Sequence, residues 1–333
     1  ILQIIGIDQL GGMVNPYHWT TFNPEISVVD VHPNLKVSNT ERGLFFQVDL
    51  DHYVPARATI RLANDNTFMS YSLAQIQPNT FLTERLSHQV VNNMKYVDVE
   101  LTHEGLSRET RFHYLLQAVG PGQEYHVISN DRNCSIETKP GTFYQTNVIW
   151  IDKVKEFAPV TDGFHLSPVY QIQPFDLAIK SKFRVGIRYD RDLVEHSNLG
   201  IYYYDGKEEE WVYTPTENNR RKQILTAELE QMDAVTVIQD LDSPQIKNTF
   251  PGNSGRYHIQ DVNRIEIEVD DSISGIESEE ASFDLLLNDN PVHPAYQPLK
   301  KTVSYNFDHP LKEGQHKIDF KVRDRMGNES AGT

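Results

Sequence analysis

The chain has 333 residues with 31 basic and 47 acidic side chains, and its formal net charge is −16 at neutral pH. This acidity excludes nucleic acid and anionic lipid as expected partners, because neutralising phosphates requires a cationic face. The longest apolar runs, such as residues 2–7, fall far short of the roughly 20 residues of a membrane-spanning helix. A single cysteine, Cys134, excludes an internal disulfide and a cysteine-based zinc site.

The composition favours strands and turns over helices. The chain holds 16 Tyr and 15 Phe together with 18 Gly and 17 Pro. Aromatic residues are enriched in strands, whereas Gly and Pro mark turns. A length of 333 residues suits two to four domains rather than one. Because the sequence starts at Ile1 inside an apolar run, we expect a fragment or processed product of a longer protein.

The first part of the chain alternates apolar and polar residues in short runs. Residues 1–23 read as the end of a preceding unit and a linker, and alternation then runs through segments such as 44–50 and 96–101. Such spacing is typical of an antiparallel sandwich and predicts an immunoglobulin-like domain over residues 24–119. Residues 80–94 have only weak helical periodicity, which predicts a short helix or a long loop.

A second predicted sandwich covers residues 120–240 and begins at the turn Gly120-Pro121-Gly122. Asp205-Gly206 lies between the apolar run 199–204 and the next strand, which predicts a hairpin with a slightly long turn. Cys134 lies between polar neighbours, and we read it as an edge or turn residue.

A third predicted sandwich covers residues 241–333 and begins at Asp242-Ser243-Pro244. Its last strand, over residues 316–322, leads into a turn at 324–328 whose residues tolerate positive φ. No strict repeat period links the three units. The fold class predicted for the chain is therefore all-β, with tandem antiparallel immunoglobulin-like β-sandwich domains.

Local catalytic motifs are absent from the sequence. Its 13 histidines include no His-x-His or His-Glu-x-x-His pair, the spacings that commonly place two zinc ligands together. Gly252-Asn253-Ser254-Gly255 lacks the Gly-x-Ser-x-Gly elbow of serine hydrolases. A catalytic Cys134 would need a neighbouring base. We expect a non-catalytic chain, and an enzyme whose ligands converge from distant loops is the remaining alternative.

Two polar clusters follow strands of the third unit. Asp270 and Asp271 follow one predicted strand, and Asp324 precedes Asn328 after another. Carboxylates on turns at one end of a sandwich are suited to hold calcium between domains, so these four residues are candidate ligands and calcium is the candidate cofactor. The alternative is that the Asp side chains accept hydrogen bonds from their own turns.

Aromatic residues of the second unit are candidates for binding carbohydrate. Tyr203 and Trp211 lie in neighbouring predicted strands and would form such a platform if both faced outward. Because alternate residues of a strand face the core, packing is the competing explanation for this aromatic content.

Three motifs of the third unit carry a resemblance. They are Asp242-Ser243-Pro244-Gln245-Ile246, Asp271-Ser272-Ile273-Ser274-Gly275-Ile276 and Val322-Arg323-Asp324-Arg325-Met326-Gly327-Asn328. They resemble the D-x-P-x-I, D-x-x-S-G-I and V-x-D-x-x-G-N patterns of bacterial immunoglobulin-like modules.

The second unit contains Pro140-Gly141-Thr142-Phe143-Tyr144, Leu166-Ser167-Pro168-Val169-Tyr170 and Leu199-Gly200-Ile201-Tyr202-Tyr203-Tyr204-Asp205-Gly206. This order is similar to the sandwich that precedes such a module in C-terminal regions of exported lysostaphin-type zinc endopeptidases, which cut peptidoglycan. The resemblance covers about residues 122–330, and residues 1–119 carry no resemblance that we can name.

The resemblance implies an accessory region, because the His-x-x-x-Asp and His-x-His motifs of those peptidases are missing here. It implies a structural or targeting module of a cell-envelope protein that is extracellular, on the cell surface or periplasmic. Cell-wall glycan or other envelope proteins are the expected partners. The alternative function is a surface adhesin or a carbohydrate-binding array.

Overall fold

A computed structural model describes residues 31–332 except 41, 52, 54–55, 93, 104–108, 155–156, 161–162, 176 and 191–197. Over these residues the chain is almost entirely β, and its strands pair antiparallel. The predicted fold class, all-β with tandem antiparallel sandwiches, is confirmed. The predicted end of a preceding unit, residues 1–23, lies outside the described residues.

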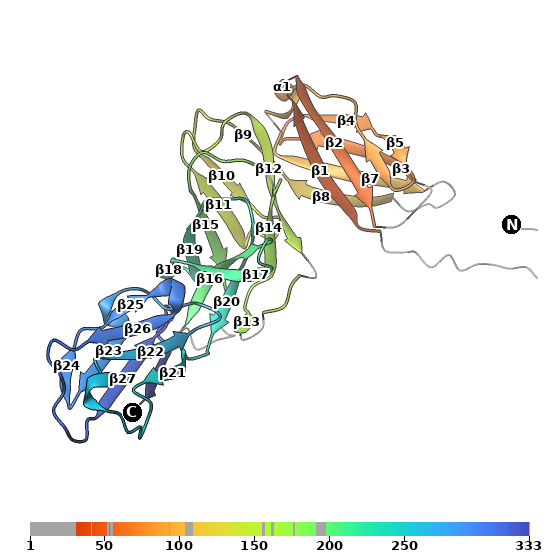
Figure 1. Ribbon diagram of the computed structural model, residues 1–333. Helices are drawn as coiled ribbons and strands as arrows, with labels where there is room; N and C mark the ends of the chain where they lie inside the picture. Colours follow the sequence, from red (N-terminus) through yellow and green to blue (C-terminus); the bar gives the residue numbers. More distant parts are fainter. Residues whose placement is uncertain are drawn as a thin grey trace, which may run out of the picture.

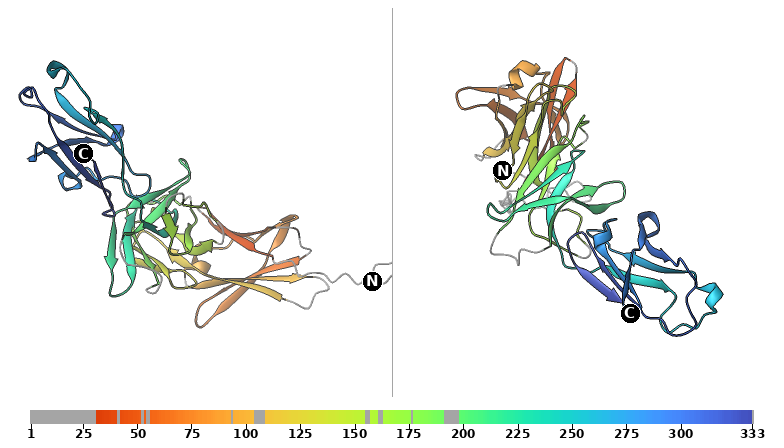
Figure 2. Two further views of the ribbon diagram at one scale, coloured as in Figure 1. Left: turned by 90° about the horizontal axis from the view of Figure 1, so that it is seen from below. Right: turned by 90° about the vertical axis from the view of Figure 1, so that its left-hand side faces the viewer.

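The sheets form three pairs that follow one another along the chain. The first pair uses residues 33–115, the second 117–240 and the third 245–332. We call them the first, second and third sandwiches. They lie in a row, with the first and third at opposite ends of an elongated molecule (Figures 1 and 2). The domain borders near residues 23, 120 and 241 stay predictions.

The first sandwich packs two four-stranded sheets, β1-β2-β6-β5 and β4-β3-β7-β8. In β2 every second side chain, Phe46, Val48 and Leu50, is buried, as the period of a strand requires. The stretch 80–94 contains both a short strand and one turn of helix. The elements are β1 (Pro33–Thr40), β2 (Gly43–Leu50), β3 (Ala56–Ala63), β4 (Phe68–Ser72), β5 (Ala74–Gln77), β6 (Thr80–Leu82), α1 (His88–Val91), β7 (Tyr96–His103) and β8 (Glu109–Leu115).

The second sandwich packs a five-stranded sheet, β10-β11-β15-β19-β18, against a seven-stranded sheet, β17-β16-β20-β14-β12-β9 with β13 beside β20. The predicted hairpin is present, since Asp205 pairs with Glu210. The strands are β9 (Gln117–Val119), β10 (Tyr125–Ile128), β11 (Cys134–Thr138), β12 (Asn147–Val154), β13 (Gly163–His165), β14 (Val169–Gln173), β15 (Phe183–Arg188), β16 (Leu199–Asp205), β17 (Glu210–Thr214), β18 (Thr216–Asn219), β19 (Ile224–Leu229) and β20 (Ala234–Asp240).

Cys134 lies in an inner strand and not, as predicted, at an edge or in a turn. It begins β11, which lies between β10 and β15, and its side chain is buried in the core of the second sandwich. Asn133, which precedes it, belongs to a turn where Asp131 accepts a hydrogen bond from the Ser129 hydroxyl, whereas Ser135 already lies in β11. The edge or turn reading was wrong because those turn residues concealed the start of a strand.

The third sandwich packs the sheets β21-β22-β26-β25 and β24-β23-β27-β28. Its core is smaller and is built around Val269, Phe283 and Phe320. The elements are β21 (Gln245–Phe250), β22 (Arg264–Asp270), β23 (Phe283–Leu287), β24 (Asn290–Val292), β25 (Ala295–Gln297), β26 (Thr302–Asn306), β27 (Ile318–Arg323) and β28 (Glu329–Gly332), with the 3-10 turns η2 (Ile259–Asp261), η3 (Glu280–Ser282) and η4 (Pro298–Lys300).

Strand β12 joins the first two sandwiches, because its residues 147–151 are buried on both faces. Val148 and Trp150 pack into the core of the first sandwich, whereas Ile149 and Ile151 pack into the core of the second. One strand therefore contributes side chains to two hydrophobic cores.

The second and third sandwiches also share an apolar contact. Ile273 of the loop after β22 packs in one cluster with Tyr202, Trp211 and Ile238 of the second sandwich. The Arg325 guanidinium lies 5.9 Å from the ring centre of Tyr213. Among the described residues, no helix has the length and apolar character needed to cross a membrane.

Candidate functional site

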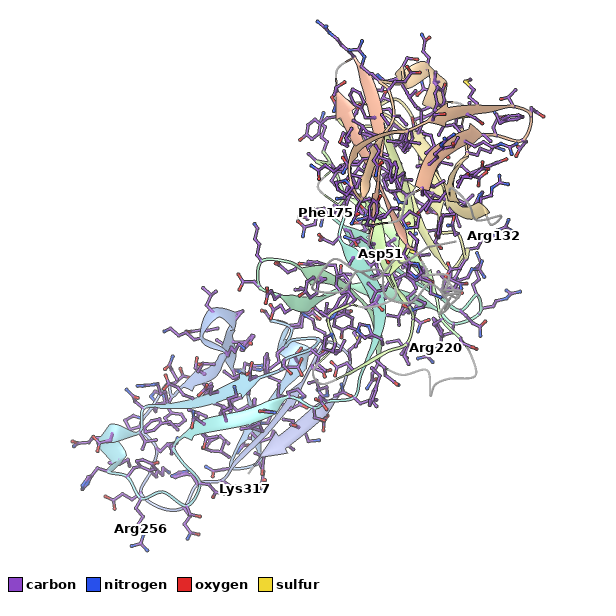
Figure 3. The ribbon with its side chains drawn as sticks, turned by 90° about the vertical axis from the view of Figure 1, so that its right-hand side faces the viewer. Asp51, Arg132, Phe175, Arg220, Arg256 and Lys317 are labelled. Carbon is purple, nitrogen blue, oxygen red and sulfur yellow. The ribbon has the colours of Figure 1, made fainter. Side chains whose placement is uncertain are left out.

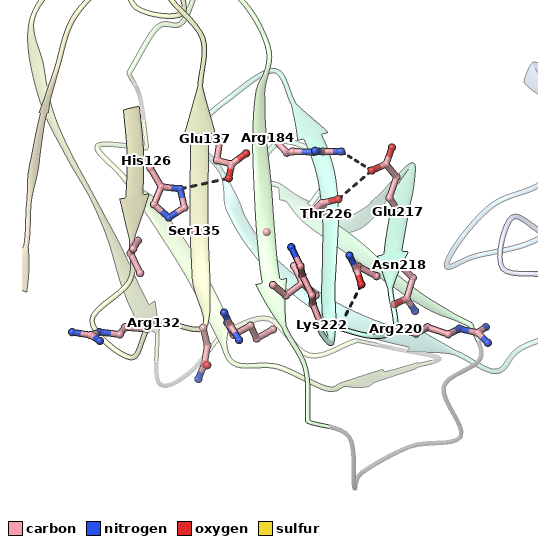
Figure 4. Close-up of a pocket in the computed structure, with 16 residues that line it drawn as sticks. His126, Arg132, Ser135, Glu137, Arg184, Glu217, Asn218, Arg220, Lys222 and Thr226 are labelled. Atoms are coloured by element: carbon pink, nitrogen blue, oxygen red, sulfur yellow. Dashed lines mark hydrogen bonds and ion pairs between the residues drawn. The ribbon is translucent and has the colours of Figure 1, made fainter. Parts of the chain in front are cut away.

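A groove of about 770 Å³ crosses the outer face of the five-stranded sheet of the second sandwich (Figure 4). All five strands of that sheet, and the turns at their ends, contribute to it. Its central row is formed by three small residues that are register partners, Ser135 of β11, Gly186 of β15 and Thr226 of β19. The lining residues are His126, Ile128, Arg132, Asn133, Ser135, Glu137, Arg184, Gly186, Arg188, Glu217, Asn218, Asn219, Arg220, Lys222, Ile224 and Thr226.

The floor of the groove is low because Gly186 has no side chain. A Cβ atom at this position would lie 3.2 Å from the Ser135 hydroxyl oxygen and 3.7 Å from Cγ2 atoms of Ile224 and Thr226. Contacts of that length mean that even a methyl group would occupy space between the flanking side chains. A larger side chain at residue 186 would therefore fill the middle of the groove.

Positive charge gathers around this floor. The lining holds five Arg or Lys residues and two Glu residues, an excess of three positive charges, in a chain whose net charge is −16. The five cations are Arg132, Arg184, Arg188, Arg220 and Lys222, and all are exposed. Arg132 and Arg220 lie on the same side of the middle part of the molecule in Figure 3.

Two ion pairs take up part of this charge. The Arg184 guanidinium lies 2.5 Å from the Glu217 carboxylate, and Nδ1 of His126 lies 3.6 Å from a Glu137 oxygen. Figure 4 shows both pairs at the same end of the groove. Among the described residues, the side chains of the other four cations form no ion pair within 4.0 Å. They remain available to an anionic ligand.

The groove has the chemistry of a binding surface. Guanidinium groups present paired donors that match the two oxygens of a carboxylate. The hydroxyls of Ser135 and Thr226 and the amides of Asn218 and Asn219 supply further donors and acceptors for a sugar or a peptide.

No local pattern of the sequence predicts this groove. Arg184, Gly186 and Arg188 alternate along β15, so the sequence alone places them on one face of a strand. The sequence does not show that this face points outward or that β11, β18 and β19 add residues to it. Both depend on pairing between distant strands, which no local pattern reveals.

The predicted calcium residues are partly brought together. Asp271 and Asp324 lie beside Asp240, the last residue of β20, and one carboxylate oxygen of each residue lies within 4.8 Å of the others. Asp240 and Asp324 are buried, and Asp271 is half-buried. Burial raises the pKa of Asp240 to about 6, and neighbouring carboxylates add to this effect.

Asp270 is a correction to the predicted ligand set. Successive residues point to opposite sides of a strand, so Asp270 faces away from the cluster that its neighbour Asp271 joins. Its two carboxylate oxygens form ion pairs with Lys247 and with Lys301. These pairs hold the pKa of Asp270 below its usual range despite the opposing effect of burial.

Asn328 lies at the cluster but supports it instead of offering an oxygen to it. Its Nδ2 donates to Oδ2 of Asp324 at 2.7 Å and to the carbonyl of Asp240 at 3.2 Å. Its Oδ1 accepts a 2.5 Å hydrogen bond from Nδ2 of Asn198 in the second sandwich. Asn328 therefore links the two sandwiches.

Local turn bonding, the alternative explanation for the Asp residues, is also present. Oδ1 of Asp324 accepts hydrogen bonds from the amides of Met326 and Asn328, each at 2.8 Å. Oδ2 of Asp271 accepts a 2.5 Å hydrogen bond from the amide of Gly275. Each of these two carboxylates is thus oriented by its own turn.

Tyr203 and Trp211 do not form one platform. Trp211 is register partner of Tyr204, so Tyr203 projects from the opposite face of the hairpin. Trp211 is buried against Phe157 and Tyr204, and its Nε1 donates to the Ala158 carbonyl at 3.1 Å. Tyr203 is half-buried against the core of the second sandwich. Alternate residues of a strand face opposite sides of the sheet, and this explains why Tyr203 and Trp211 lie on different faces.

The chain was also compared with known proteins. No protein-family model matches it, and no curated protein shows a similarity strong enough to count as a match.

Proposed function

We propose that this chain is a non-catalytic targeting and spacing module of an exported cell-envelope protein, the accessory region of a peptidoglycan hydrolase. In this proposal the groove on the five-stranded sheet holds a carboxylate-bearing cell-wall polymer. The motifs of the second and third units support the assignment to a peptidoglycan hydrolase, and the groove supports the targeting role.

The observation that carries the proposal is a cationic groove on a strongly acidic chain. A net charge of −16 repels anionic polymers in general, so only a local excess of positive charge lets one approach. Four cations that form no ion pair with the described residues, Arg132, Arg188, Arg220 and Lys222, supply that excess around a floor with no side chain at Gly186.

Peptidoglycan fits this surface chemically. Its stem peptides carry free carboxylates at intervals, and its sugars carry hydroxyl and amide groups. The guanidinium groups suit the carboxylates, and Asn218 and Asn219 suit the hydroxyls and amides.

Binding to purified peptidoglycan sacculi tests the proposal directly. We expect the chain to co-sediment with sacculi, and the double change Arg188→Glu with Lys222→Glu to weaken binding at least about tenfold, as loss of charge-assisted contacts would. Gly186→Leu fills the groove without changing charge and should also abolish co-sedimentation. Binding should fall as salt rises, because both charged partners are exposed.

Arg256→Glu is the matched control, because Arg256 is exposed at the far end of the third sandwich (Figure 3). It should leave binding unchanged. Equal loss in this control and in the groove variants would contradict the proposal. Binding to neutral glycans on an array, insensitive to salt and to Arg188→Glu, would instead support a carbohydrate-binding adhesin. Release of soluble fragments from sacculi by this chain alone would contradict a non-catalytic role.

A further inference from the structure

Two polar atoms at the junction of the second and third sandwiches are buried and have no hydrogen-bond partner among the residues that the structure describes. One is Oδ2 of Asp240, and the other is the hydroxyl of Tyr202 in β16. Both residues have an exposed fraction of 0%. Leaving a buried polar atom unsatisfied costs about 1–3 kcal/mol, so two together in one place point to a partner that completes the site.

Asp240 belongs to a cluster of three carboxylates, and Tyr202 lies near that cluster. Asp240, Asp271 and Asp324 each offer one carboxylate oxygen within 4.8 Å of the others. Tyr202 lies close enough to interact electrostatically with all three carboxylates. Burial raises the pKa of its hydroxyl most, and these carboxylates raise it further. Among the described residues, no Lys, Arg or His side chain lies within 4.0 Å of the three carboxylates.

We propose that Asp240, Asp271 and Asp324 bind a calcium ion between the second and third sandwiches. Calcium takes oxygen ligands at about 2.3–2.6 Å, so the oxygens that share one ion are separated by distances up to about 5 Å. The spacing of the three carboxylate oxygens falls in that range. An ion there gives Oδ2 of Asp240 a partner and balances charges that otherwise repel one another.

The ligand chemistry favours calcium over other metals. All donors are oxygens, whereas zinc prefers nitrogen and sulfur ligands. The ligands come from three different strand ends, and calcium accepts the flexible geometry that such a set gives more readily than magnesium, which demands near-ideal octahedral geometry. The turn amides that hold Asp271 and Asp324 preorganise two of the three carboxylates.

The ion would fasten one sandwich to the next. Asp240 ends β20 of the second sandwich, whereas Asp271 and Asp324 follow β22 and β27 of the third. Asn328 and Ile273 already join the same surfaces by a hydrogen bond and by an apolar contact. Calcium would therefore set the angle between the two sandwiches.

Isothermal titration of the whole chain with calcium chloride tests the proposal. We expect one ion per chain and a melting temperature about 5 °C higher in millimolar calcium than in a chelator, because the ion binds only the folded junction. Asp240→Asn and Asp271→Asn should each weaken calcium binding about tenfold or more. Magnesium chloride at the same concentration should give little heat.

Asp270→Asn is the matched control, since Asp270 precedes Asp271 and pairs with two lysines outside the cluster. It should bind calcium as tightly as the unchanged chain. The proposal is overturned if the unchanged chain shows neither heat nor a melting shift, if Asp270→Asn loses binding as Asp240→Asn does, or if magnesium substitutes fully. Should Asp240→Asn fail to fold, Asp271→Asn and the titration of the unchanged chain decide the matter. Calcium binding and the melting shift are measured without peptidoglycan, so they test this site separately from the proposed function.

Discussion

Asp152 places a carboxylate in the contact between the first two sandwiches. It lies on β12, and its Oδ2 accepts a 2.8 Å hydrogen bond from Nε1 of Trp150. Burial raises its pKa to about 6, which that hydrogen bond only partly offsets. The folded state therefore binds the proton of Asp152 more tightly than the unfolded chain does.

The consequence is a pH dependence of a definite sign. The pKa of Asp152 is higher in the folded chain than the value of about 3.9 in the unfolded chain. Its contribution to stability is therefore fully present below about pH 4 and is lost as the pH rises through about 6. We predict that Asp152→Asn raises the free energy of unfolding by about 1–2 kcal/mol at pH 7.5 and changes it little at pH 4. Urea denaturation at both pH values measures this, and an equal effect at both would contradict it.

Cys134 offers a second test at this scale. Its thiol is buried, and burial raises its pKa above the usual range, with the Asp131 carboxylate adding to the effect. A protonated, inaccessible thiol is a poor nucleophile. We predict that a thiol reagent labels the native chain only as fast as the chain unfolds, and labels one thiol at once in denaturant. Rapid labelling in native buffer would contradict the burial.

Individual site residues were only partly predictable. Asp271 and Asp324 were found because each belongs to a turn motif that follows a strand. Asp240 was missed, since it ends a strand more than 30 residues earlier and reaches the cluster only through the docking of two sandwiches. Asp270 was included wrongly because the sequence does not reveal which of two adjacent carboxylates faces inward.

Strand β12 is the element on which the first two sandwiches depend. Its run of five buried residues, 147–151, has the near-continuous apolar pattern of a strand covered on both faces. Nδ2 of Asn39 also donates to the Thr146 carbonyl at 2.6 Å, which ties β1 to the start of β12. The two cores therefore meet along one strand.

We predict that Trp150→Ala destabilises the first sandwich by about 3–5 kcal/mol, as removal of a large buried side chain does. Trp150 is among the largest fully buried side chains of the described residues. Urea denaturation followed by circular dichroism measures the loss. Tyr144→Ala removes a side chain that is 64% exposed and serves as the control. An effect of similar size in both variants would count against a shared core.

The positions of individual strands could be predicted better from the sequence than the residues of the sites. The alternating runs around residues 44–50 and 96–101 and the apolar run 199–204 all lie in strands. A strand with one covered face has a clear period of two, whereas the first four residues of β16 are all buried and form a continuous apolar run. β11 was misjudged at Cys134, and the hairpin face of Tyr203 was left open. The burial of Cys134 and the direction of Tyr203 both depend on which face of a sheet packs against the other sheet. Pairing with strands distant in the sequence decides this.

At the scale of the whole molecule, the third sandwich contacts the second through side chains of its loops. Ile273 enters an apolar cluster of the second sandwich, and Asn198 bonds to Asn328 beside it. Such a contact fixes an orientation without merging two cores. The angle at this junction is therefore easier to change than the fold of either sandwich.

We predict that Ile273→Asp releases the third sandwich, because it puts an uncompensated charge into an apolar contact. Small-angle scattering should show a larger radius of gyration and a broader distance distribution, while strand content by circular dichroism stays the same. Ser272→Asp adds the same charge at an exposed neighbouring position and should leave the scattering unchanged. An unchanged profile for Ile273→Asp would mean that other contacts hold the junction.

The order of the strands in the second sandwich has a mechanical consequence. The chain enters this sandwich at β9 and leaves it at β20, and both strands belong to the seven-stranded sheet. A pull on the two ends of the molecule would thus run through the ladder β9-β12-β14-β20. Its narrowest step is β14 to β20, where only Tyr170 and Gln171 have register partners. The five-stranded sheet lies off this load path, so the groove would keep its shape while the chain carries tension.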